Sequence, residues 1–295
     1  MASSASLAER YAQDGYLVLD KVVVPPELLA RAVDGMEAVR RGDSDTGRGC
    51  AGGNGGIDES GVLCKMELPQ LASHAIREVV SLGAVGDWAA RATGASWVQV
   101  WWTQLLGKPT GNGGENFNIG FHQDRNYWQS SWEEGSELLT AWVALSDVGE
   151  DSGPMKFIRS SNAWGLLDGA NFFHEGDLAA HKAHCLSRAP AGAAWDEVAA
   201  VLPAGGISLH DNYTLHGSGP NTSGIYRRSL AVHMRTNRSQ PKLQDGGTDR
   251  AGLTAYLDEL DVNPVIYGRE AFEADRAAAA RPQLLPSRSS SQAKL

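Results

Sequence analysis

Apolar side chains in the first third of the chain follow the spacing of helices. Over residues 26–41 they recur at every third or fourth position, after a proline pair and before Gly42, which predicts a helix that begins at the prolines and ends at the glycine. Residues 6–15 predict a shorter helix, and residues 68–94 predict a helical stretch broken near two of its glycines. Between the first two helices, "YLVLDKVVV" at 16–24 predicts a strand.

The pattern changes at about residue 95. From there the chain holds short apolar or alternating runs, rich in Val, Trp, Phe and Ile, that Gly, Pro, Asn and Asp separate. Such runs are typical of the strands of a β-sandwich or barrel. They lie at 96–106, 116–124, 137–148, 153–158, 205–210, 213–218 and 227–236.

Three further segments have a weaker pattern. The Gly-rich residues 42–61 predict a loop, residues 160–200 an irregular and partly helical insert, and residues 249–280 a polar helical region. The whole pattern predicts one domain over 1–286 that is mainly β with flanking α. We expect a double-stranded β-helix (an antiparallel, cupin-like jelly roll) with a core at about 95–238, N-terminal helices packed on its major sheet, and a disordered tail at 287–295.

Composition limits the kinds of partner and compartment. The 295 residues are 42% hydrophobic, enough for a real core, and the net charge is −9, so no global basic field attracts nucleic acid or anionic lipid. Three cysteines without a CxxC motif argue against a disulfide framework and fit a reducing compartment. No apolar run approaches the roughly 20 residues of a membrane helix.

The two chain ends suggest a location. The N-terminus lacks the charged start and apolar centre of a secretory signal, so we expect a cytoplasmic protein. The Ser-rich tail ends in Ala293, Lys294 and Leu295, a variant of the Ser-Lys-Leu address that a peroxisomal import receptor reads. In a eukaryote, these three residues would direct the protein to the peroxisomal matrix.

A histidine and an aspartate lie two positions apart in "GFHQDRNYW". On a strand, residues i and i+2 point to the same side, so His122 and Asp124 would project together and Gln123 away from them. An imidazole and a carboxylate supply two corners of a metal site. Two histidines and one carboxylate on one face of an octahedron leave open positions, which suits Fe(II) that must bind a cosubstrate and O₂.

A second motif, "LHDNYTLHGSGPNTSGIYRRS", strengthens the metal hypothesis. His216 ends an apolar strand, and Arg227 follows eleven residues later. A guanidinium can bind the distal carboxylate of a keto acid through two parallel hydrogen bonds. Ser218 can donate to the same carboxylate. Arg228 competes with Arg227, but neighbours on a strand point in opposite directions, so only one of them can face the site.

Taken together, these motifs resemble the phytanoyl-CoA dioxygenase family of Fe(II)/2-oxoglutarate-dependent oxygenases. The resemblance runs from "YAQDGYLVL" to about residue 236, and is strongest in "HQD", "ELLTAWVALSDVGEDSGPMKFIRSSN" and "HGSGPNTSGIYRR". It implies His122, Asp124 and His216 as iron ligands, and it implies that Arg227 and Ser218 bind 2-oxoglutarate.

The resemblance extends to weaker positions. Trp142 in "TAWVAL" and Gln104 in "WWTQLLGKP" match positions that line the cosubstrate pocket, and Lys65 in "CKMEL" resembles a further cosubstrate contact. Asn162 departs from the family, which usually carries a histidine there. Because the carboxylate Asp124 is present, the resemblance implies hydroxylation, desaturation or ring closure rather than halogenation.

The substrate is expected to be a small organic molecule: an acyl-CoA, an amino-acid derivative or a secondary metabolite. The residues that follow the metal pair predict either a substrate wall or ordinary packing; they are Asn126, Tyr127, Trp128 and Trp132. An acyl-CoA would need a basic mouth for its phosphates, and the candidates for it are Arg125, Lys156 and Arg159.

Two other classes of protein share the pattern. One is a jelly-roll metalloenzyme that uses no keto acid, which usually supplies more histidines to its metal. The other is a non-catalytic jelly-roll binding module, against which the complete ligand set argues.

Several other chemistry-bearing residues are assigned simpler roles. His181, His184 and Cys185 predict a solvated segment. His210 cannot chelate a metal together with its neighbour Asp211, since they face opposite ways, and packing is the expected role of His233. Trp101 and Trp102 should alternate, so that at most one faces inward.

Overall fold

The computed structural model describes residues 6–54, 63–111, 118–167, 177–243 and 252–280. The predicted tail at 287–295, with the terminal tripeptide, lies outside the described residues, so the peroxisomal address stays a prediction. Among the described residues, no helix is long and apolar enough to cross a membrane.

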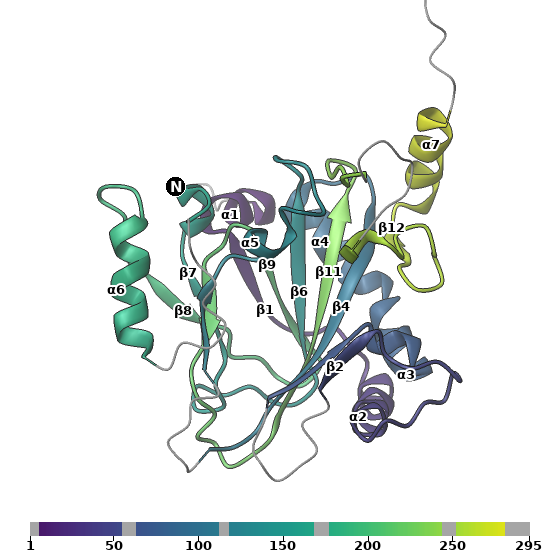
Figure 1. The fold of residues 1–295 in the computed structure, drawn as a ribbon, viewed down its shortest axis with the longest axis horizontal. Helices are drawn as coiled ribbons and strands as arrows, with labels where there is room; N and C mark the ends of the chain where they lie inside the picture. Colours follow the sequence, from purple (N-terminus) through teal and green to yellow (C-terminus); the bar gives the residue numbers. More distant parts are fainter. Residues whose placement is uncertain (1–5, 55–62, 112–117, 168–176, 244–251, 281–295) are drawn as a thin grey trace, which may run out of the picture.

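Two antiparallel sheets form the centre of the molecule (Figure 1). The larger sheet has the order β1-β9-β6-β11-β4-β3-β2, and β12 pairs with β4. Its strands are β1 (Tyr16–Val22), β2 (Gly52–Asn54), β3 (Cys64–Glu67), β4 (Val98–Lys108), β6 (Leu138–Ala144), β9 (Gly206–Asp211), β11 (Arg227–Thr236) and β12 (Val265–Tyr267). The smaller sheet has the order β5-β10-β7-β8, with β5 (Ile119–His122), β7 (Met155–Ile158), β8 (Glu197–Ala199) and β10 (His216–Ser218).

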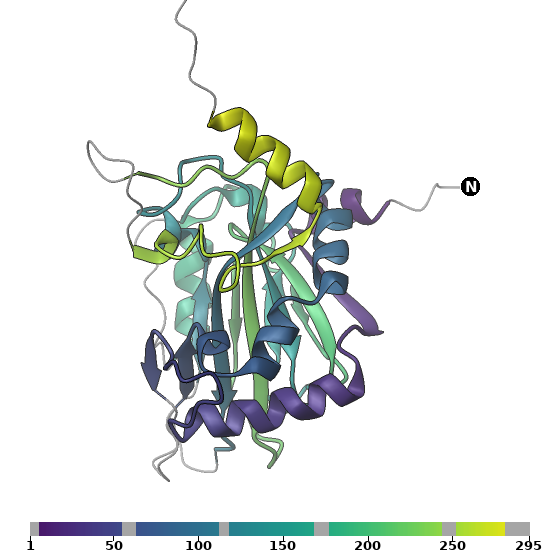
Figure 2. The ribbon, with the colours of Figure 1, turned by 90° about the vertical axis from the view of Figure 1, so that its right-hand side faces the viewer.

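Helices cover the outer face of the larger sheet, as Figure 2 shows for α2, α3 and α4. In Figure 1, α6 lies beside the smaller sheet and α7 at the other side of the molecule. The helices are α1 (Leu7–Asp14), α2 (Pro26–Arg40), α3 (His74–Val80), α4 (Gly83–Thr93), α5 (Arg125–Trp128), α6 (Leu178–Arg188) and α7 (Arg269–Ala279), with single 3₁₀ turns η1 (Pro69–Leu71), η2 (Ser161–Trp164) and η3 (Gly252–Thr254).

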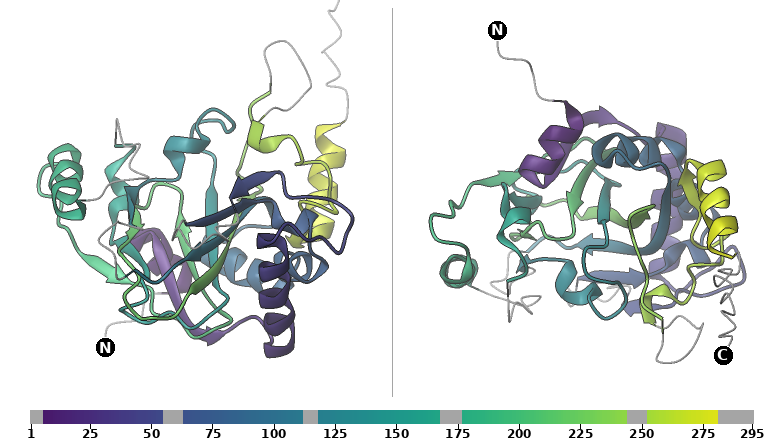
Figure 3. Two further views of the ribbon diagram at one scale, coloured as in Figure 1. Left: turned by 60° about the horizontal axis from the view of Figure 1, so that its bottom comes forward. Right: turned by 90° about the horizontal axis from the view of Figure 1, so that it is seen from above.

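Alternation along each strand divides the larger sheet into two faces. On β6, Leu139, Ala141 and Val143 pack with the helices in the main core, whereas Trp142 and Ala144 pack toward the smaller sheet. Side chains of one strand point to opposite faces at successive positions, so each strand supplies both the helix-covered core and the space between the sheets. Figure 3 shows the layers from two further directions.

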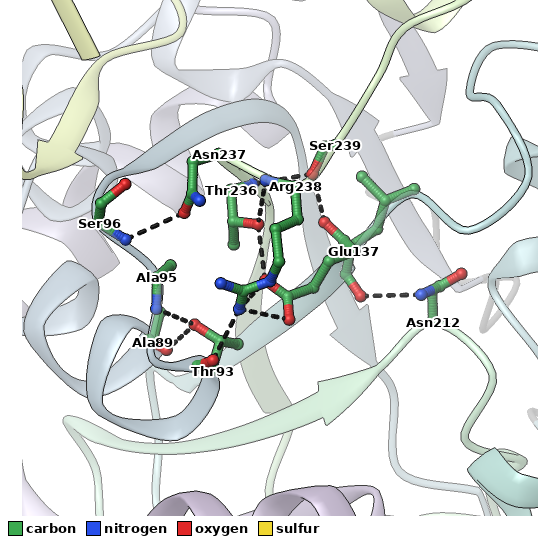
Figure 4. Close-up of polar contacts among 11 residues, drawn as sticks. Ala89, Thr93, Ala95, Ser96, Glu137, Asn212, Thr236, Asn237, Arg238 and Ser239 are labelled. Carbon is green, nitrogen blue, oxygen red and sulfur yellow. Dashed lines mark hydrogen bonds and ion pairs between the residues drawn. The ribbon is translucent and has the colours of Figure 1, made fainter. Parts of the chain in front are cut away.

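The strand ends are tied together by polar contacts (Figure 4). Glu137, before β6, accepts hydrogen bonds from the Thr236 hydroxyl (2.6 Å) and from the Arg238 guanidinium (2.8 Å) after β11. The same guanidinium donates to the Thr93 carbonyl at the end of α4 (2.7 Å). The side-chain amide of Asn212 donates to the Leu138 carbonyl (3.0 Å). These bonds connect the end of α4 with the ends of β6, β9 and β11.

The architecture confirms the predicted fold class: mainly β, with antiparallel sheets and flanking helices. Helices at 7–14 and 26–40 lie where the sequence predicts them. The expected loop at 42–61 is wrong at Gly52–Asn54, which pair with β3, and residues 55–61 lie outside the described residues. The polar C-terminal region also contains a strand, β12, that the helical pattern did not predict.

The break between α3 and α4 falls at residues 81–82, directly before Gly83, which begins α4, whereas Gly86 lies inside this helix. Gly86 is needed there for packing. A Cβ at this position would collide with the carbonyl of Ile266 in β12. The glycine therefore serves close approach between a helix and a strand rather than a helix end.

Candidate active site

His122 and His216 are brought together by the pairing of β5 with β10, where they are direct cross-strand partners. Their ring centroids lie 4.2 Å apart. Each Nδ1 lies close to a backbone carbonyl, at 2.8 Å from Gly120 and 2.9 Å from Thr214. Because a carbonyl only accepts, each Nδ1 carries the hydrogen, and each Nε2 has a lone pair for a metal. Burial lowers the pKa of both imidazoles, which favours their neutral, ligating form.

Asp124 reaches the same point from a turn rather than from a strand. β5 ends at His122, and Asp124 has helical backbone angles (φ −55°, ψ −33°) at the start of α5. The expected continuous strand is therefore wrong, although Gln123 does point away, to the carbonyls of Gly165 (2.8 Å) and Tyr213 (2.7 Å). His216 likewise opens β10 instead of ending a strand.

The three side chains suit one divalent metal ion. Asp124 Oδ1 lies 3.8 Å from His122 Nε2 and 3.7 Å from His216 Nε2, and one ligand atom from each residue lies within 4.8 Å of the others. All three are buried, at 6%, 8% and 3% exposure for His122, Asp124 and His216. Two imidazole nitrogens and one carboxylate oxygen form the donor set that Fe(II) oxygenases use, with open positions left for other ligands.

A polar row beneath Asp124 holds its second oxygen. Asp124 Oδ2 lies 3.1 Å from the Thr140 hydroxyl and 3.3 Å from His210 Nε2, and Thr140 Oγ1 lies 2.8 Å from His233 Nδ1. Since Thr140 has one hydrogen, a consistent arrangement has His233 donating to Thr140 and Thr140 donating to Asp124. Burial opposes ionisation of Asp124, but His216 and His210 outweigh it and lower the pKa of the carboxyl.

Strand register creates this row. Thr140 on β6 is the direct partner of His210 on β9 and of His233 on β11. From the sequence, His210 and its neighbour Asp211 were not expected to chelate one metal together, and His233 was assigned to packing. His233 does pack, with its ring 4.9 Å from that of Trp128, but both histidines also face Asp124, which sequence reasoning missed. The alternation of side chains along β9 and β11 indicates that both histidines point inward.

A chamber extends from the three ligand atoms between the two sheets. It encloses about 660 Å³, including space open to solvent. Besides the ligands and the polar row, its walls include Arg227, Ser218, Trp142, Gln104, Lys65, Leu106, Ile119 and Met155. It is called the first chamber below.

Arg227 is a buried cation at the wall of the first chamber. Only 4% of the residue is exposed; one Nη donates to the Gly153 carbonyl, and the guanidinium lies 5.1 Å from the ring centroid of Trp142. Its Nε has no hydrogen-bond partner among the described residues. Burial lowers its pKa to about 10, so it remains charged at neutral pH. Arg228 faces the other way, with Nε 2.7 Å from Glu37 on α2, as strand alternation requires.

Lys108 is a buried cation that the sequence argument did not identify. It is the register partner of Arg227 on β4, and its Nζ donates to the Ser218 hydroxyl and to the Gly219 carbonyl (2.6 Å). Because Ser218 accepts from Lys108, its own hydrogen is free to point into the chamber. Burial lowers the pKa of Lys108, and the charge of Arg227 adds to this effect. The sequence does indicate its direction, because Lys108 and Gln104 lie an even number of positions apart on β4 and therefore on the same face.

A second chamber meets the first at the ligands. It encloses about 870 Å³, including space open to solvent, and has a more aromatic wall. The chambers share Lys65, Gln104, His122, Asp124 and His233. The second alone is lined by Glu67, Trp102, Tyr127, Trp128 and Leu253.

The four residues predicted as a substrate wall separate in the structure. Tyr127 and Trp128 line the second chamber. Asn126 is not part of its lining, and Trp132 is fully buried against Trp101, with ring centroids 5.3 Å apart. Which of them contact a substrate stays a prediction.

Both neighbouring tryptophans of β4 lie on the inner side, contrary to their expected alternation. Trp102 lines the second chamber, and Trp101 packs edge-on against Trp128 at 4.9 Å. The register between β11 and β4 shifts at this point, from His233 opposite Trp102 to Met234 opposite Val100. A β-bulge of this kind places one extra residue in a strand and breaks its alternation.

The predicted solvated cluster on α6 is largely buried. His181 and Cys185 are 3% and 1% exposed, and only His184 faces solvent. His181 Nδ1 accepts a hydrogen bond from the Phe121 backbone amide (3.2 Å). The helix thus uses this histidine to satisfy an amide of β5, the strand that carries His122.

The fold and the site together define a class: a jelly-roll protein with a buried two-histidine, one-carboxylate metal centre. Within that class, residues 11–229 match the model of the family described as phytanoyl-CoA dioxygenase (PhyH). This match spans most of the chain, and the protein therefore belongs to the PhyH family, which confirms the resemblance in its motifs.

One curated relative has a name that refers to alpha-ketoglutarate. The chain is 29% identical over 175 residues to a probable alpha-ketoglutarate-dependent hypophosphite dioxygenase of Stutzerimonas stutzeri, across 54% of this chain and 58% of that protein. The chain thus spans little more than half the length of this curated relative.

Solved structures share the fold at low identity. The epimerase SnoN of nogalamycin biosynthesis, in complex with Fe³⁺, alpha ketoglutarate and nogalamycin RO, has a TM-score of 0.65 and 21% identity, over 88% of this chain and 97% of SnoN. EctD from S. alaskensis, with 2-oxoglutarate and 5-hydroxyectoine, has a TM-score of 0.56 and 16% identity, over 86% and 83% of the two chains.

Proposed function

We propose that this protein is an Fe(II)- and 2-oxoglutarate-dependent dioxygenase that hydroxylates a small organic substrate or oxidises it by hydrogen abstraction. The observation that carries the proposal is the buried guanidinium of Arg227, which has no ion pair among the described residues and lies in the chamber that also holds three convergent metal ligands. In the hydroxylation, one atom of O₂ enters the product and the other enters succinate, while 2-oxoglutarate loses CO₂.

His122, Asp124 and His216 would hold the iron, which supplies the redox chemistry with O₂ when bound. The two imidazoles donate hydrogen bonds to the carbonyls of Gly120 and Thr214, and these bonds fix their orientation. Thr140 and His210 occupy Asp124 Oδ2 and leave Oδ1 to face both Nε2 atoms. The chain thereby presents one oxygen and two nitrogens to the metal.

Arg227 and Ser218 would bind the distal carboxylate of 2-oxoglutarate. Arg227 supplies charge and parallel N–H donors, and Lys108 orients the Ser218 hydroxyl by donating to its oxygen. Trp142 lies against the guanidinium and limits its movement. Gln104 and Lys65 stand where the two chambers meet, so they are expected to contact the part of the cosubstrate nearer the metal.

The residues of the site favour this function over the two alternative classes of protein. A keto-acid-free jelly-roll enzyme has no need of a buried arginine on the wall of the first chamber, and a binding module has no need of three oriented ligands. The carboxylate of Asp124 also occupies the position that a halide would need, so oxidation without halogenation is expected. The hypophosphite dioxygenase relative, which is named for alpha-ketoglutarate, supports the same cosubstrate.

The first test is binding of Fe(II) and 2-oxoglutarate without air. The wild-type protein should develop the visible metal-to-ligand charge-transfer absorption of a chelated keto acid. Arg227→Met should raise the dissociation constant of 2-oxoglutarate about 30- to 150-fold, because two charge-assisted hydrogen bonds contribute roughly 2–3 kcal/mol. Arg228→Met is the matched control and should bind as the wild type does. Absence of the absorption in the wild-type protein would rule the proposal out.

A further inference from the structure

The second chamber is large, and apart from the metal ligand Asp124 its described walls carry no net charge. Apart from the ligand Asp124, its charged side chains among the described residues are Lys65 and Glu67, which lie 3.4 Å apart as an ion pair. Opposite charges on adjacent sites of one strand face offset each other, so the chamber attracts neither anions nor cations strongly.

The cations that a phosphate-bearing substrate would need are already engaged. Lys156 Nζ lies 2.7 Å from Glu197, and Arg159 pairs at 2.7 Å with both Asp14 and Asp196. Arg125 is only 4% exposed and lines a different hollow. Within the described ranges, the basic mouth for an acyl-CoA is therefore not formed by the predicted residues.

Aromatic side chains dominate the rest of the wall, and contacts restrict their motion. The Trp102 indole N–H donates to Glu67 at 2.6 Å. The Tyr127 ring lies edge-on to that of His122 at 5.9 Å, and Trp128 lies edge-on to Trp101 at 4.9 Å. Trp102 and Tyr127 each retain partial exposure. Aromatic rings that are already fixed at the edge of a cavity bind planar apolar ring systems at a low cost in conformational entropy.

Glu67 is the hydrogen-bond acceptor of this wall. Its oxygens accept from Trp102 and, at 3.2 Å, from the Gln104 amide, and its side chain remains 21% exposed. Each carboxylate oxygen can accept about two hydrogen bonds, so Glu67 retains capacity toward the chamber. A hydroxyl or an amide N–H on the substrate fits that capacity, whereas an ionised phosphate or carboxylate has no hydrogen to donate to Glu67.

We propose that the second chamber binds a neutral, ring-containing organic molecule whose ring system contacts Trp102, Tyr127 and Trp128 and whose hydroxyl or N–H group donates to Glu67. This inference rests on the proposed oxygenase function and adds the substrate class to it. It excludes acyl-CoA thioesters and small inorganic anions as the principal substrates, including the kind of anion named for the curated relative.

The test uses the full-length protein with Fe(II) and 2-oxoglutarate, without air. Tryptophan fluorescence and the charge-transfer absorption are followed while probes are added. The probes are 2-naphthol, naphthalene, 1-naphthyl phosphate, hypophosphite and decanoyl-CoA. 2-Naphthol should bind at least tenfold more tightly than each of the other four. Tighter binding of either phosphorus anion or of the CoA thioester would overturn the substrate class.

Glu67→Gln separates the hydrogen bond from general packing. It should weaken 2-naphthol binding about tenfold or more, because a bond to a charged acceptor is lost, while naphthalene binding stays unchanged. Glu197→Gln is a matched control, since Glu197 also accepts from an indole, Trp195 (3.0 Å), and from a lysine, and it should bind 2-naphthol normally. Equal weakening in both variants, or in neither, contradicts the proposal.

Failure of the substrate class and failure of the oxygenase function give different results. A wild-type protein that shows no charge-transfer absorption with Fe(II) and 2-oxoglutarate lacks the proposed function. A protein that shows the absorption but prefers the anionic probes retains the function and loses the proposed substrate class. Persistence of the absorption in Glu67→Gln verifies that this variant is folded and loaded.

Discussion

The Thr140 hydroxyl lies between His233 and the outer oxygen of Asp124, at 2.8 Å and 3.1 Å. Its bond is to Oδ2 of Asp124 and not to Oδ1, the oxygen that faces the two imidazoles. Its effect is to hold the carboxylate with one oxygen turned toward them. Partners of this kind orient ligands and contribute to metal affinity.

Thr140→Val removes this hydroxyl and keeps the shape of the side chain. Affinity for Co(II), measured by calorimetry on metal-free protein, should fall about 10- to 100-fold. Thr103→Val serves as the control, since Thr103 is equally buried but bonds to Gln70, and its metal affinity should not change. Unchanged affinity in Thr140→Val would show that Asp124 needs no such support.

His233 makes the stability of the metal-free protein depend on pH. Burial lowers its pKa to about 4 from an ordinary value of 6.5. Between these values the unfolded chain binds the proton and the folded one does not, so stability is complete above pH 6.5 and is lost as the pH falls toward 4. From pH 7 to pH 5 the loss due to His233 is about 2 kcal/mol.

Urea unfolding of the wild type and of His233→Asn at these two pH values measures that loss. The variant should lose about 2 kcal/mol less than the wild type on acidification. Subtracting the two removes the effect of Asp211, whose pKa burial raises to about 6 and which therefore acts in the opposite direction. Parallel losses in both proteins would mean that His233 does not titrate in this range.

At the scale of elements, the contact between β5 and β10 sets the distance between the two histidine ligands. Gly217, between His216 and Ser218, lies against the backbone of β5: a Cβ there would lie 2.8 Å from the Ile119 carbonyl oxygen and 3.1 Å from the Phe121 nitrogen. Backbone atoms cannot move aside as a flexible side chain can. The strand pair is therefore this close only because residue 217 has no side chain.

Gly217→Ala should push β10 away from β5 and separate His122 from His216. Metal affinity should fall at least tenfold, because ligand placement within a fraction of an ångström is needed. Gly219→Ala is the control, since a Cβ there meets nothing within 4 Å. Calorimetric Co(II) titration of both variants, with thermal unfolding as a check on folding, decides the matter; equal affinity in the two would contradict the expected displacement.

Strand parity explains which cation serves which part of the molecule. On β11, Arg227, Ala231 and His233 line the first chamber, whereas Arg228 reaches Glu37 on α2 at 2.7 Å. The two neighbouring arginines thus face the first chamber and the helix layer respectively. Their roles follow from period-two geometry and would exchange if the register slipped by one residue.

At the scale of the whole molecule, the site joins the two sheets. The two histidine ligands lie on the smaller sheet, while Asp124 contacts Thr140 and His210 of the larger one. Ser218 and Arg227, expected to bind the same carboxylate, also come from different sheets. Ligands bound here would connect both layers and stabilise the folded state relative to the unfolded chain.

Co(II) with 2-oxoglutarate should therefore raise the melting temperature. At a concentration one hundred times the dissociation constant, binding contributes about 2.7 kcal/mol, or roughly 5 °C for a chain of this size. Asp124→Ala should show no such rise above its own ligand-free value. Differential scanning calorimetry checks both. A similar rise in the variant would place the stabilising ion elsewhere on the protein.

Local sequence determined much of this protein. Strand alternation, helical spacing and turn residues predicted most elements, because they reflect which side of a strand or helix is buried. The short motifs also named His122, Asp124, His216 and Arg227, which the structure brings to one chamber. These residues could be recognised because each pair lies within one motif: His122 and Asp124 are two positions apart, and His216 and Arg227 are eleven positions apart.

Which residues surround His122, Asp124 and His216 was decided only by the tertiary structure. Thr140, His210 and His233 belong to three strands far apart in the sequence, and register alone places them in one row. The bulge in β4 turned both Trp101 and Trp102 inward, and the pairing of β3 with β4 put Glu67 opposite Gln104. Alternation predicts which face a side chain occupies, but long-range pairing determines which neighbours it meets there.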